Sequence, residues 1–267
     1  MHRPSLVALA RCLSLLWLVE PAGCKRRAPE PAPAAEPAPP VEAAASPSPA
    51  PESAAGWEAQ AYDVHAWSFG LDKYELRVVD VAMTTALDAV LSKQGSELVV
   101  NGGFFDPRGE PIGLAVSDGA VMSRLARKLS GGVVTSDGTR ARLWESESFA
   151  MPSGTRFAIQ CRPRLVVDGA ANVKSDDGKR AVRTALCLRD GGKTVEVVVV
   201  RGAHEGEGVG PSLFALSHFL VRRGCEGAQN LDGGPSTGVA WREGGAVRVI
   251  APVRPVRHVV SFARRAP

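Results

Sequence analysis

Four Asp-Gly pairs divide the middle of the chain into short segments rich in β-branched residues. Asp-Gly between such segments is the strongest local signal for a two-residue hairpin turn, because both residues accept the positive φ that this turn requires. Each turn of this kind joins two neighbouring antiparallel strands, so the pattern predicts a largely antiparallel sheet. The pairs begin at Asp118, Asp137, Asp168 and Asp190.

The last of these turns separates the clearest pair of expected strands, Arg183–Leu188 and Thr194–Val200. The second strand contains the unbroken valine run Val197–Val200. An uninterrupted apolar run predicts a strand covered on both faces. We expect this strand to lie at the centre of the sheet.

Two other segments have the features of helices. Thr85–Lys93 is followed by Gly95, and Ser212–Arg223 carries leucines at helical spacing before Gly224. Glycine just after the last helical residue is a common helix stop. Each helix precedes a short strand and a glycine loop. The predicted fold class is α+β, with a mixed, largely antiparallel sheet and two main helices in a single domain.

The first 56 residues differ in character from the rest. Residues 1–24 have the layout of an export signal, in which basic residues precede a short apolar run and Ala22-Gly23 stand before Cys24. This layout predicts a lipoprotein anchored through Cys24, and simple secretion is the alternative. Residues 25–56 are mostly Pro, Ala, Glu and Ser, a composition that predicts a disordered linker. We therefore expect an exported, cell-envelope or secreted domain over residues 57–267.

Charge and cysteine content narrow the choice of partners. The formal net charge of +4 includes the basic signal region and the arginine-rich tail, so the domain has no nucleic-acid footprint. Cys161, Cys187 and Cys225 lack metal-ligand spacing. No sequence motif signals a metal or another cofactor, and we expect none. At most one internal disulfide is possible among the three cysteines, and we expect buried free thiols.

The first glycine loop, Asn101-Gly102-Gly103, follows an expected strand. Paired glycines let backbone N–H groups approach an anionic ligand such as a phosphate, and the Asn101 amide can both donate and accept hydrogen bonds. The alternative is a tight turn that leads into two core aromatic residues, Phe104 and Phe105.

The second glycine loop, Asp232-Gly233-Gly234, follows Asn230 at the end of another expected strand. A carboxylate there, with little side-chain cover, can activate water or stabilise developing positive charge. The alternative is ordinary turn chemistry, which we assign to the similar Asp190-Gly191-Gly192. Loops that follow strands in helix–strand units commonly hold ligands, so the two loops can converge on one cleft.

Residues Gly234–Gly238 match the Gly-x-Ser-x-Gly pattern of serine hydrolases, with Ser236 as the nucleophile. That pattern requires a helix after the serine, whereas residues 238–250 have the pattern of a β-hairpin. His204, His218 and His258 are available as bases, but none stands in a recognisable motif. A serine hydrolase is therefore a minor alternative.

Arg183 opens one of the expected strands, and its guanidinium group suits bidentate phosphate binding. The alternative is an ordinary arginine at a strand end. Arg162 and Arg164 flank Pro163 and are second choices for the same role.

Taken in order, these segments resemble the phosphodiester glycosidase family. The resemblance spans roughly Val99 to Trp241. It departs at Pro235, which stands where the family has a third glycine, and at Arg201–Glu205, where the family has Asp-Gly. The matching segments, in chain order, are Asn101–Phe105, Gly113-Leu114, Asp118-Gly119, Arg164–Gly169, Arg183–Val200 and Leu213–Ser236.

The resemblance implies hydrolysis of the bond between a sugar's anomeric carbon and a phosphodiester phosphate in an envelope or extracellular glycan or glycolipid. It implies that Asp232 acts on water or on the oxocarbenium-like sugar, with Asn101 and Arg183 in the catalytic set. A non-catalytic envelope protein that binds glycan through the same cleft is the main alternative. The implied substrate-binding residues are Gly102, Gly103, Asn230, Gly233, Gly234 and Ser236.

Overall fold

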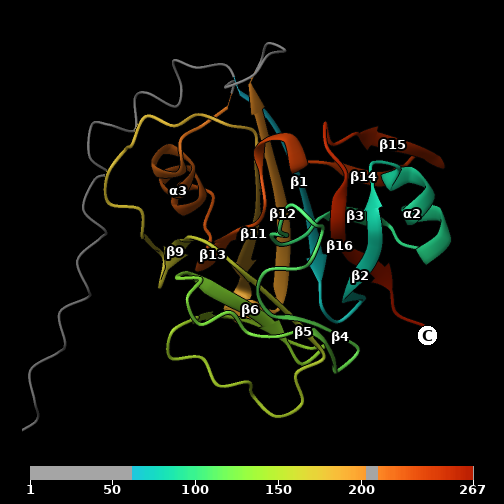
Figure 1. Ribbon diagram of the computed structural model, residues 1–267, viewed down its shortest axis with the longest axis horizontal. Coiled ribbons are helices and arrows are strands. Elements are labelled where there is room, and N and C mark those ends of the chain that lie inside the picture. The colour runs from blue at the N-terminus through green and yellow to red at the C-terminus, as the bar shows by residue number, and fades with distance from the viewer. Residues whose placement is uncertain (1–61, 203–209, 267) are drawn as a thin grey trace, which may run out of the picture. The chain divides into compact units, whose positions relative to one another are not determined.

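The computed structural model describes residues 62–202 and 210–266 of the 267-residue chain. The expected export signal, Cys24, the linker and His204 lie outside these residues. Three sheets and two α-helices form the described part of the chain, which belongs to one compact unit (Figure 1). Every strand pairing within it is antiparallel.

The first sheet contains six strands. In spatial order they are β1 (Tyr62–Gly70), β12 (Thr194–Gly202), β11 (Arg183–Arg189), β13 (Gly227–Asn230), β9 (Arg164–Val167) and β10 (Ala170–Ala171). Val195, Val197 and Val199 of β12 face the central core, while Val198 and Val200 pack on the opposite face. The predicted cover on both faces is confirmed, whereas the predicted central place is wrong, because β12 is the second strand of the six, next to the edge strand β1.

The second sheet positions the Asn101 segment. In spatial order its strands are β15 (Ala246–Ile250), β14 (Val239–Glu243), β3 (Leu98–Asn101), β16 (Val256–Arg264) and β2 (Tyr74–Thr84). Leu98 and Val100 of β3 point into the central core, and Val99 points the other way. This alternation buries β3 on both faces.

The third sheet closes the remaining side of the central core. Its strands, in spatial order, are β5 (Ala120–Ser123), β4 (Ala115–Ser117), β8 (Phe157–Cys161), β6 (Gly132–Ser136) and β7 (Ala141–Glu145). Phe157, Ile159 and Cys161 of β8 join the same core as the inward valines of β12. Residues from all three sheets therefore share one apolar interior.

The predicted hairpins are all present, but the single mixed sheet is wrong. The Asp-Gly pairs separate β4 from β5, β6 from β7, β9 from β10 and β11 from β12. A turn signal specifies which strands are joined, and it carries no information on which hairpins share a sheet. The strands that follow the helices, β3 and β13, also pair antiparallel with their neighbours, so the expected mixed character is absent from the described residues.

The two helices cover outer faces of the first and second sheets (Figure 1). Helix α2 (Leu87–Gln94) ends at Gly95, whose φ of 64° is the left-handed conformation of a helix stop. Helix α3 (Leu213–Arg222) begins after Ser212, whose hydroxyl accepts a hydrogen bond from the Ala215 N–H at 3.2 Å. Both predicted helices are confirmed. No helix among the described residues has the length and apolarity needed to cross a membrane.

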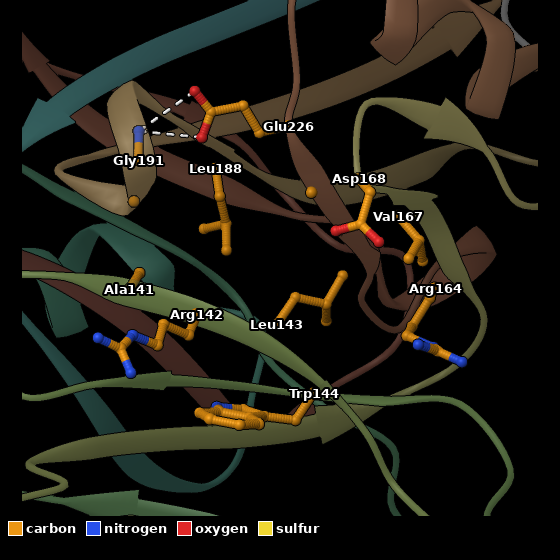
Figure 2. A pocket seen from close by; sticks show the side chains of 12 residues that line it. Ala141, Arg142, Leu143, Trp144, Arg164, Val167, Asp168, Leu188, Gly191 and Glu226 are labelled. Atoms are coloured by element: carbon orange, nitrogen blue, oxygen red, sulfur yellow. Dashed lines mark hydrogen bonds between the residues drawn. The ribbon is translucent and has the colours of Figure 1, made fainter. Parts of the chain in front are cut away.

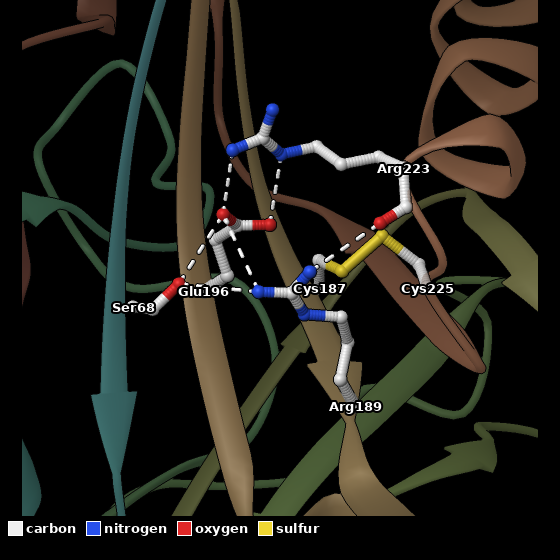
Figure 3. The surroundings of a disulfide bond; sticks show 6 residues. All are labelled: Ser68, Cys187, Arg189, Glu196, Arg223 and Cys225. Carbon is white, nitrogen blue, oxygen red and sulfur yellow. Dashed lines mark hydrogen bonds and ion pairs between the residues drawn. A yellow bond between two sulfur atoms is a disulfide. The ribbon is translucent and has the colours of Figure 1, made fainter.

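A disulfide joins Cys187 on β11 to Cys225, which follows α3 (Figure 3). The expectation of buried free thiols is therefore wrong for these two residues and holds for Cys161. Cys187 points toward the face that α3 covers, and the chain leaving α3 brings Cys225 over it. Sequence spacing alone cannot show this contact, because it depends on how the helix packs on the sheet.

Removing this disulfide should lower the free energy of unfolding by about 2–5 kcal/mol, because the bond closes a long loop of the unfolded chain. The bond joins residues separated by 38 positions. Chemical denaturation of Cys187→Ala/Cys225→Ala measures the loss, and dithiothreitol should shift the midpoint of the unmodified protein but not that of the double variant. Equal midpoints for the oxidised and reduced protein would contradict a structural role for the bond.

Candidate active site

Two glycine loops meet where the first and second sheets come together. Asn101-Gly102-Gly103 follows α2 and β3, and Asp232-Gly233-Gly234 follows α3 and β13. The Asp232 N–H donates to the Gly102 carbonyl at 3.1 Å, and the Gly102 N–H donates to the His258 carbonyl at 2.9 Å. The structure thus brings both loops into one site, as their parallel order in the sequence suggests.

The side chain of Asn101 is a clamp between these loops. It is fully buried, and its Nδ2 donates to the Asp232 carbonyl at 2.6 Å. Its Oδ1 accepts from the Thr184 hydroxyl at 2.7 Å and from the Gly238 N–H at 3.3 Å. Asn101, expected among the catalytic residues, therefore uses its amide within the protein and positions the main chain of Asp232.

Asp232 is a half-buried carboxylate. Its Oδ1 accepts a hydrogen bond from the Gly233 N–H at 2.9 Å. Burial raises the pKa of Asp232 above its usual value of 3.8, and hydrogen bonds from the Ser236 hydroxyl and the Gly233 N–H oppose this rise. The site therefore holds a carboxylate that takes up a proton more readily than an exposed one.

Arg183 lies across from Asp232. The β11–β13 pairing matches Ala185 with Asn230, and continuing that register places Arg183 opposite Asp232. Its Nε donates to the Pro211 carbonyl and its Nη2 to the Lys179 carbonyl, both at 3.2 Å. Burial lowers the pKa of Arg183 from 12.5, and the charge of Asp177 opposes this fall. Arg183 thus borders the second glycine loop, since a Cβ added at Gly233 would lie 3.9 Å from the Arg183 Cα, while its guanidinium bonds to Pro211 and Lys179.

The glycine N–H groups differ in availability. Those of Gly102, Gly233 and Gly234 donate to His258, Asp232 and Val182, respectively, within the protein. The N–H of Gly103 makes no hydrogen bond to another described residue. Gly103 is therefore the one member of this expected phosphate-binding set whose amide has no competing acceptor in the described structure.

Asn230 and Ser236 are both largely buried in the site. The Asn230 Nδ2 donates to the carbonyls of Arg162 and Leu231, at 2.8 and 2.6 Å. Ser236 ends a 3₁₀ turn, Gly234–Ser236, and Thr237 continues in extended conformation into β14. The helix that a serine-nucleophile elbow requires is absent, because this segment must turn back into the second sheet.

His258 and Cys161 stand beside the first glycine loop, although no sequence motif marked either one. A Cβ added at Gly102 would lie 2.7 Å from the His258 Nδ1. A Cβ added at Gly103 would lie 3.3 Å from both the His258 Cε1 and the Cys161 Sγ. Burial raises the pKa of the Cys161 thiol, and the charge of Asp232 raises it further. The paired glycines thus leave room for an imidazole ring and a thiol.

A pocket of about 300 Å³ lies away from the glycine loops (Figure 2). Leu143 and Leu188 point into it from opposite sides, and the Glu226 carboxylate accepts a hydrogen bond from the Gly191 N–H at 2.9 Å. Arg164, a second choice for phosphate binding, lines this pocket and pairs with Glu145 at 2.7 Å. The Arg164 guanidinium is therefore engaged by Glu145. Within residues 62–202 and 210–266, no three His, Cys, Asp or Glu side chains are grouped so that they could hold a metal.

Replacing Gly102 by alanine should destabilise the protein by roughly 1–3 kcal/mol and lower ligand binding or turnover at the site. The added Cβ would lie 2.9 Å from the His258 carbonyl oxygen, which is fixed by the β16 main chain. Gly103→Ala is the matched control, since its nearest contacts are 3.3–3.4 Å and its N–H is retained. Thermal unfolding of both variants tests this, and an equal or larger loss for Gly103→Ala would contradict it.

Comparison with known proteins finds a family model that matches the chain and solved structures that share its fold. The model of a family described as phosphodiester glycosidase (NAGPA) matches residues 94–262, a span that includes both glycine loops. A search of curated proteins gives no match.

Solved structures share the architecture at low sequence identity. A hypothetical protein from Synechocystis matches with a TM-score of 0.59 and 15% identity over 78% of this chain, which spans only 60% of that protein's length. The catalytic domain of zebrafish N-acetylglucosamine-1-phosphodiester alpha-N-acetylglucosaminidase, auto-inhibited by its pro-peptide, matches with a TM-score of 0.56 and 14% identity over 76% of this chain and 84% of its own. A putative exported protein from Burkholderia pseudomallei matches with a TM-score of 0.50 and 14% identity, over 75% of this chain and 73% of its own.

Proposed function

Because the chain belongs to the phosphodiester glycosidase family, we propose that it hydrolyses the bond between a sugar's anomeric carbon and the oxygen of a phosphodiester. The family points to a hydrolase of the glycosidase class. The finer assignment to sugar 1-phosphodiesters rests on the site and on the similarity to the zebrafish catalytic domain. The observation that carries it is Asp232, a half-buried carboxylate whose main chain is hydrogen-bonded to the first glycine loop and whose side chain accepts the Gly233 N–H.

The proposed reaction needs only one carboxylate. Water adds to the anomeric carbon, the bond from that carbon to the phosphate oxygen breaks, and the products are a free sugar and a phosphomonoester. Asp232 takes the proton of the attacking water, a role that its raised pKa favours. The leaving phosphate keeps the electron pair and needs less protonation than an alcohol, and Arg183 stabilises its charge.

In this proposal Ser236 hydrogen-bonds to Asp232 and does not act as a nucleophile. Its hydroxyl hydrogen-bonds to the Asp232 carboxylate and lowers the pKa of that group. The extended chain after Ser236 also removes the strained strand-to-helix turn on which a serine nucleophile depends.

We further propose that the protein works outside the cytoplasm, on an envelope or extracellular glycan or glycolipid. The disulfide supports this, since such bonds persist in oxidising compartments. The Burkholderia structure, which is described as a putative exported protein, has the same fold. Lipid attachment at Cys24 stays a prediction, and we expect no membrane contact beyond such an anchor and no nucleic-acid partner.

The test is hydrolysis of a panel of sugar 1-phosphodiesters by the full-length protein in ¹⁸O-labelled water. Mass spectrometry should find the label in the released sugar and none in the phosphomonoester, because the carbon–oxygen bond breaks. Label in the phosphate would instead identify a phosphodiesterase that cleaves the phosphorus–oxygen bond. Tight binding of the same glycans without any release would favour a glycan-binding protein.

A further inference from the structure

His258 is buried directly beneath the first glycine loop. Only 4% of its surface is exposed, and its Nδ1 is buried without a hydrogen-bond partner. The residue precedes Val259, which pairs with Asn101, and its ring fills the space that a side chain at Gly102 would need. Its carbonyl also accepts the Gly102 N–H. Both the ring and the main chain of His258 therefore hold the same glycine.

A buried polar atom without a partner calls for an explanation, because it lowers stability relative to an apolar side chain of similar size. Core packing alone does not supply one here, since neighbouring inward positions on β16 are Val260 and Phe262. The position of the ring links it to the reacting group. The carbonyl of Gly102 accepts the Asp232 N–H, so a shift of Gly102 moves the main chain that carries the carboxylate.

We propose that His258 is a positioning residue of this site, which holds Gly102-Gly103 against the Asp232 loop only while its imidazole is uncharged. The expected effect of His258 on kcat rests on the proposed function. Its expected effect on the position of Gly102-Gly103 does not. Protonation would place a positive charge beneath the loop, on a ring whose Nδ1 is buried without a hydrogen-bond partner.

The charged groups around the ring come from four elements. Asp80 on β2 pairs with His258 in register, but its carboxylate is held by Arg257 at 2.6 Å. The Cys161 Sγ on β8 and the His258 Cε1 both lie beside Gly103, 3.3 Å from where its Cβ would be, and the charge of Asp232 acts on this thiol. Burial lowers the pKa of His258, and Arg257 lowers it further, while Asp80 and the residue's own carbonyl raise it. The pKa of His258 therefore lies below its usual value of 6.5, which favours the uncharged ring.

The test compares His258→Ala, which removes the ring from beneath Gly102, with His258→Asn, whose uncharged amide occupies the place of Nδ1. The alanine variant should lower kcat by about 10²-fold, because a loop shift of an ångström at a catalytic group has effects of that size. The change in KM should be small, and the asparagine variant should recover most of kcat. Equal losses for the two variants, or an alanine variant as active as the native protein, would overturn the proposal.

A second measurement uses the native protein and needs no turnover. In an NMR titration, the amide resonances of Gly102 and Gly103 should shift with the same midpoint as the His258 ring nitrogens, below the usual 6.5 of histidine. The shift should persist in Asp232→Asn and disappear in His258→Asn. Glycine resonances that ignore the His258 titration would overturn the proposal, whereas absence of turnover on every phosphodiester would count against the proposed function alone.

Discussion

Replacing Asp232 by asparagine should lower kcat on the order of 10³-fold while leaving the fold intact, because the amide cannot take a proton from water. The change is nearly isosteric, and the amide oxygen can still accept the Gly233 N–H. Asp190→Asn is a matched control, since Asp190-Gly191-Gly192 repeats the same tripeptide in an exposed turn of the first sheet. Turnover of the best substrate in the panel, measured for both variants, tests the assignment.

The same substitution should raise stability at neutral pH. The folded-state pKa of Asp232 is raised above 3.8, so the folded protein binds this proton more tightly than the unfolded chain does. The associated stability is present below the unfolded pKa and is lost as the pH rises through the folded pKa. Asparagine is neutral throughout, so its advantage in melting temperature should be larger at pH 7 than at pH 3. A variant that loses activity together with stability would show that Asp232 is structural.

The second large effect is expected at Glu196, a buried carboxylate on β12 that is 2% exposed (Figure 3). The Arg223 guanidinium, at the end of α3, binds it through two hydrogen bonds of 2.9 and 2.7 Å. Arg223→Met should lower the free energy of unfolding by about 3–5 kcal/mol, because it leaves a buried charge without its main partner. Chemical denaturation measures the loss.

Arg189→Met is the control for this prediction. Its Nη2 lies 3.8 Å from the same carboxylate, too far for a direct hydrogen bond, so its loss should cost much less. Adding Glu196→Leu to Arg223→Met should restore part of the stability, since both charges are then removed. Comparable losses for the two arginine variants would mean that a nearby positive charge is enough to stabilise Glu196, without the paired hydrogen bonds of Arg223.

The sequence predicts the local elements of this fold well and their assembly less well. Asp-Gly turns, the valine run and the glycines after the helices are local signals, and the hairpins, the β12 strand and both helices follow them. The division into three sheets depends instead on long-range pairing, such as that of β16 with both β2 and β3. The Cys187–Cys225 bond likewise depends on how α3 packs over β11.

The candidate site shows the same limit. The glycine loops and Asp232 stand in recognisable segments, so the sequence could locate them. The sequence could not show where the Asn101 side chain points. In the structure its amide turns inward to Thr184 and to the Asp232 carbonyl. His258 lies far along the chain from Gly102 and in no motif, and only the pairing of β16 with β3 places it there.

The Asn101 clamp means that the direction of Asp232 is set by the spacing between two sheets. One side chain on the second sheet reaches both Thr184 of the first sheet and the loop that carries the carboxylate. A core substitution that swells the shared interior would therefore misdirect the carboxylate before it unfolds the protein. The catalytic rate should therefore respond to smaller changes in interior packing than the melting temperature does. Variants chosen for stability alone would then lose activity while their melting temperature stays high.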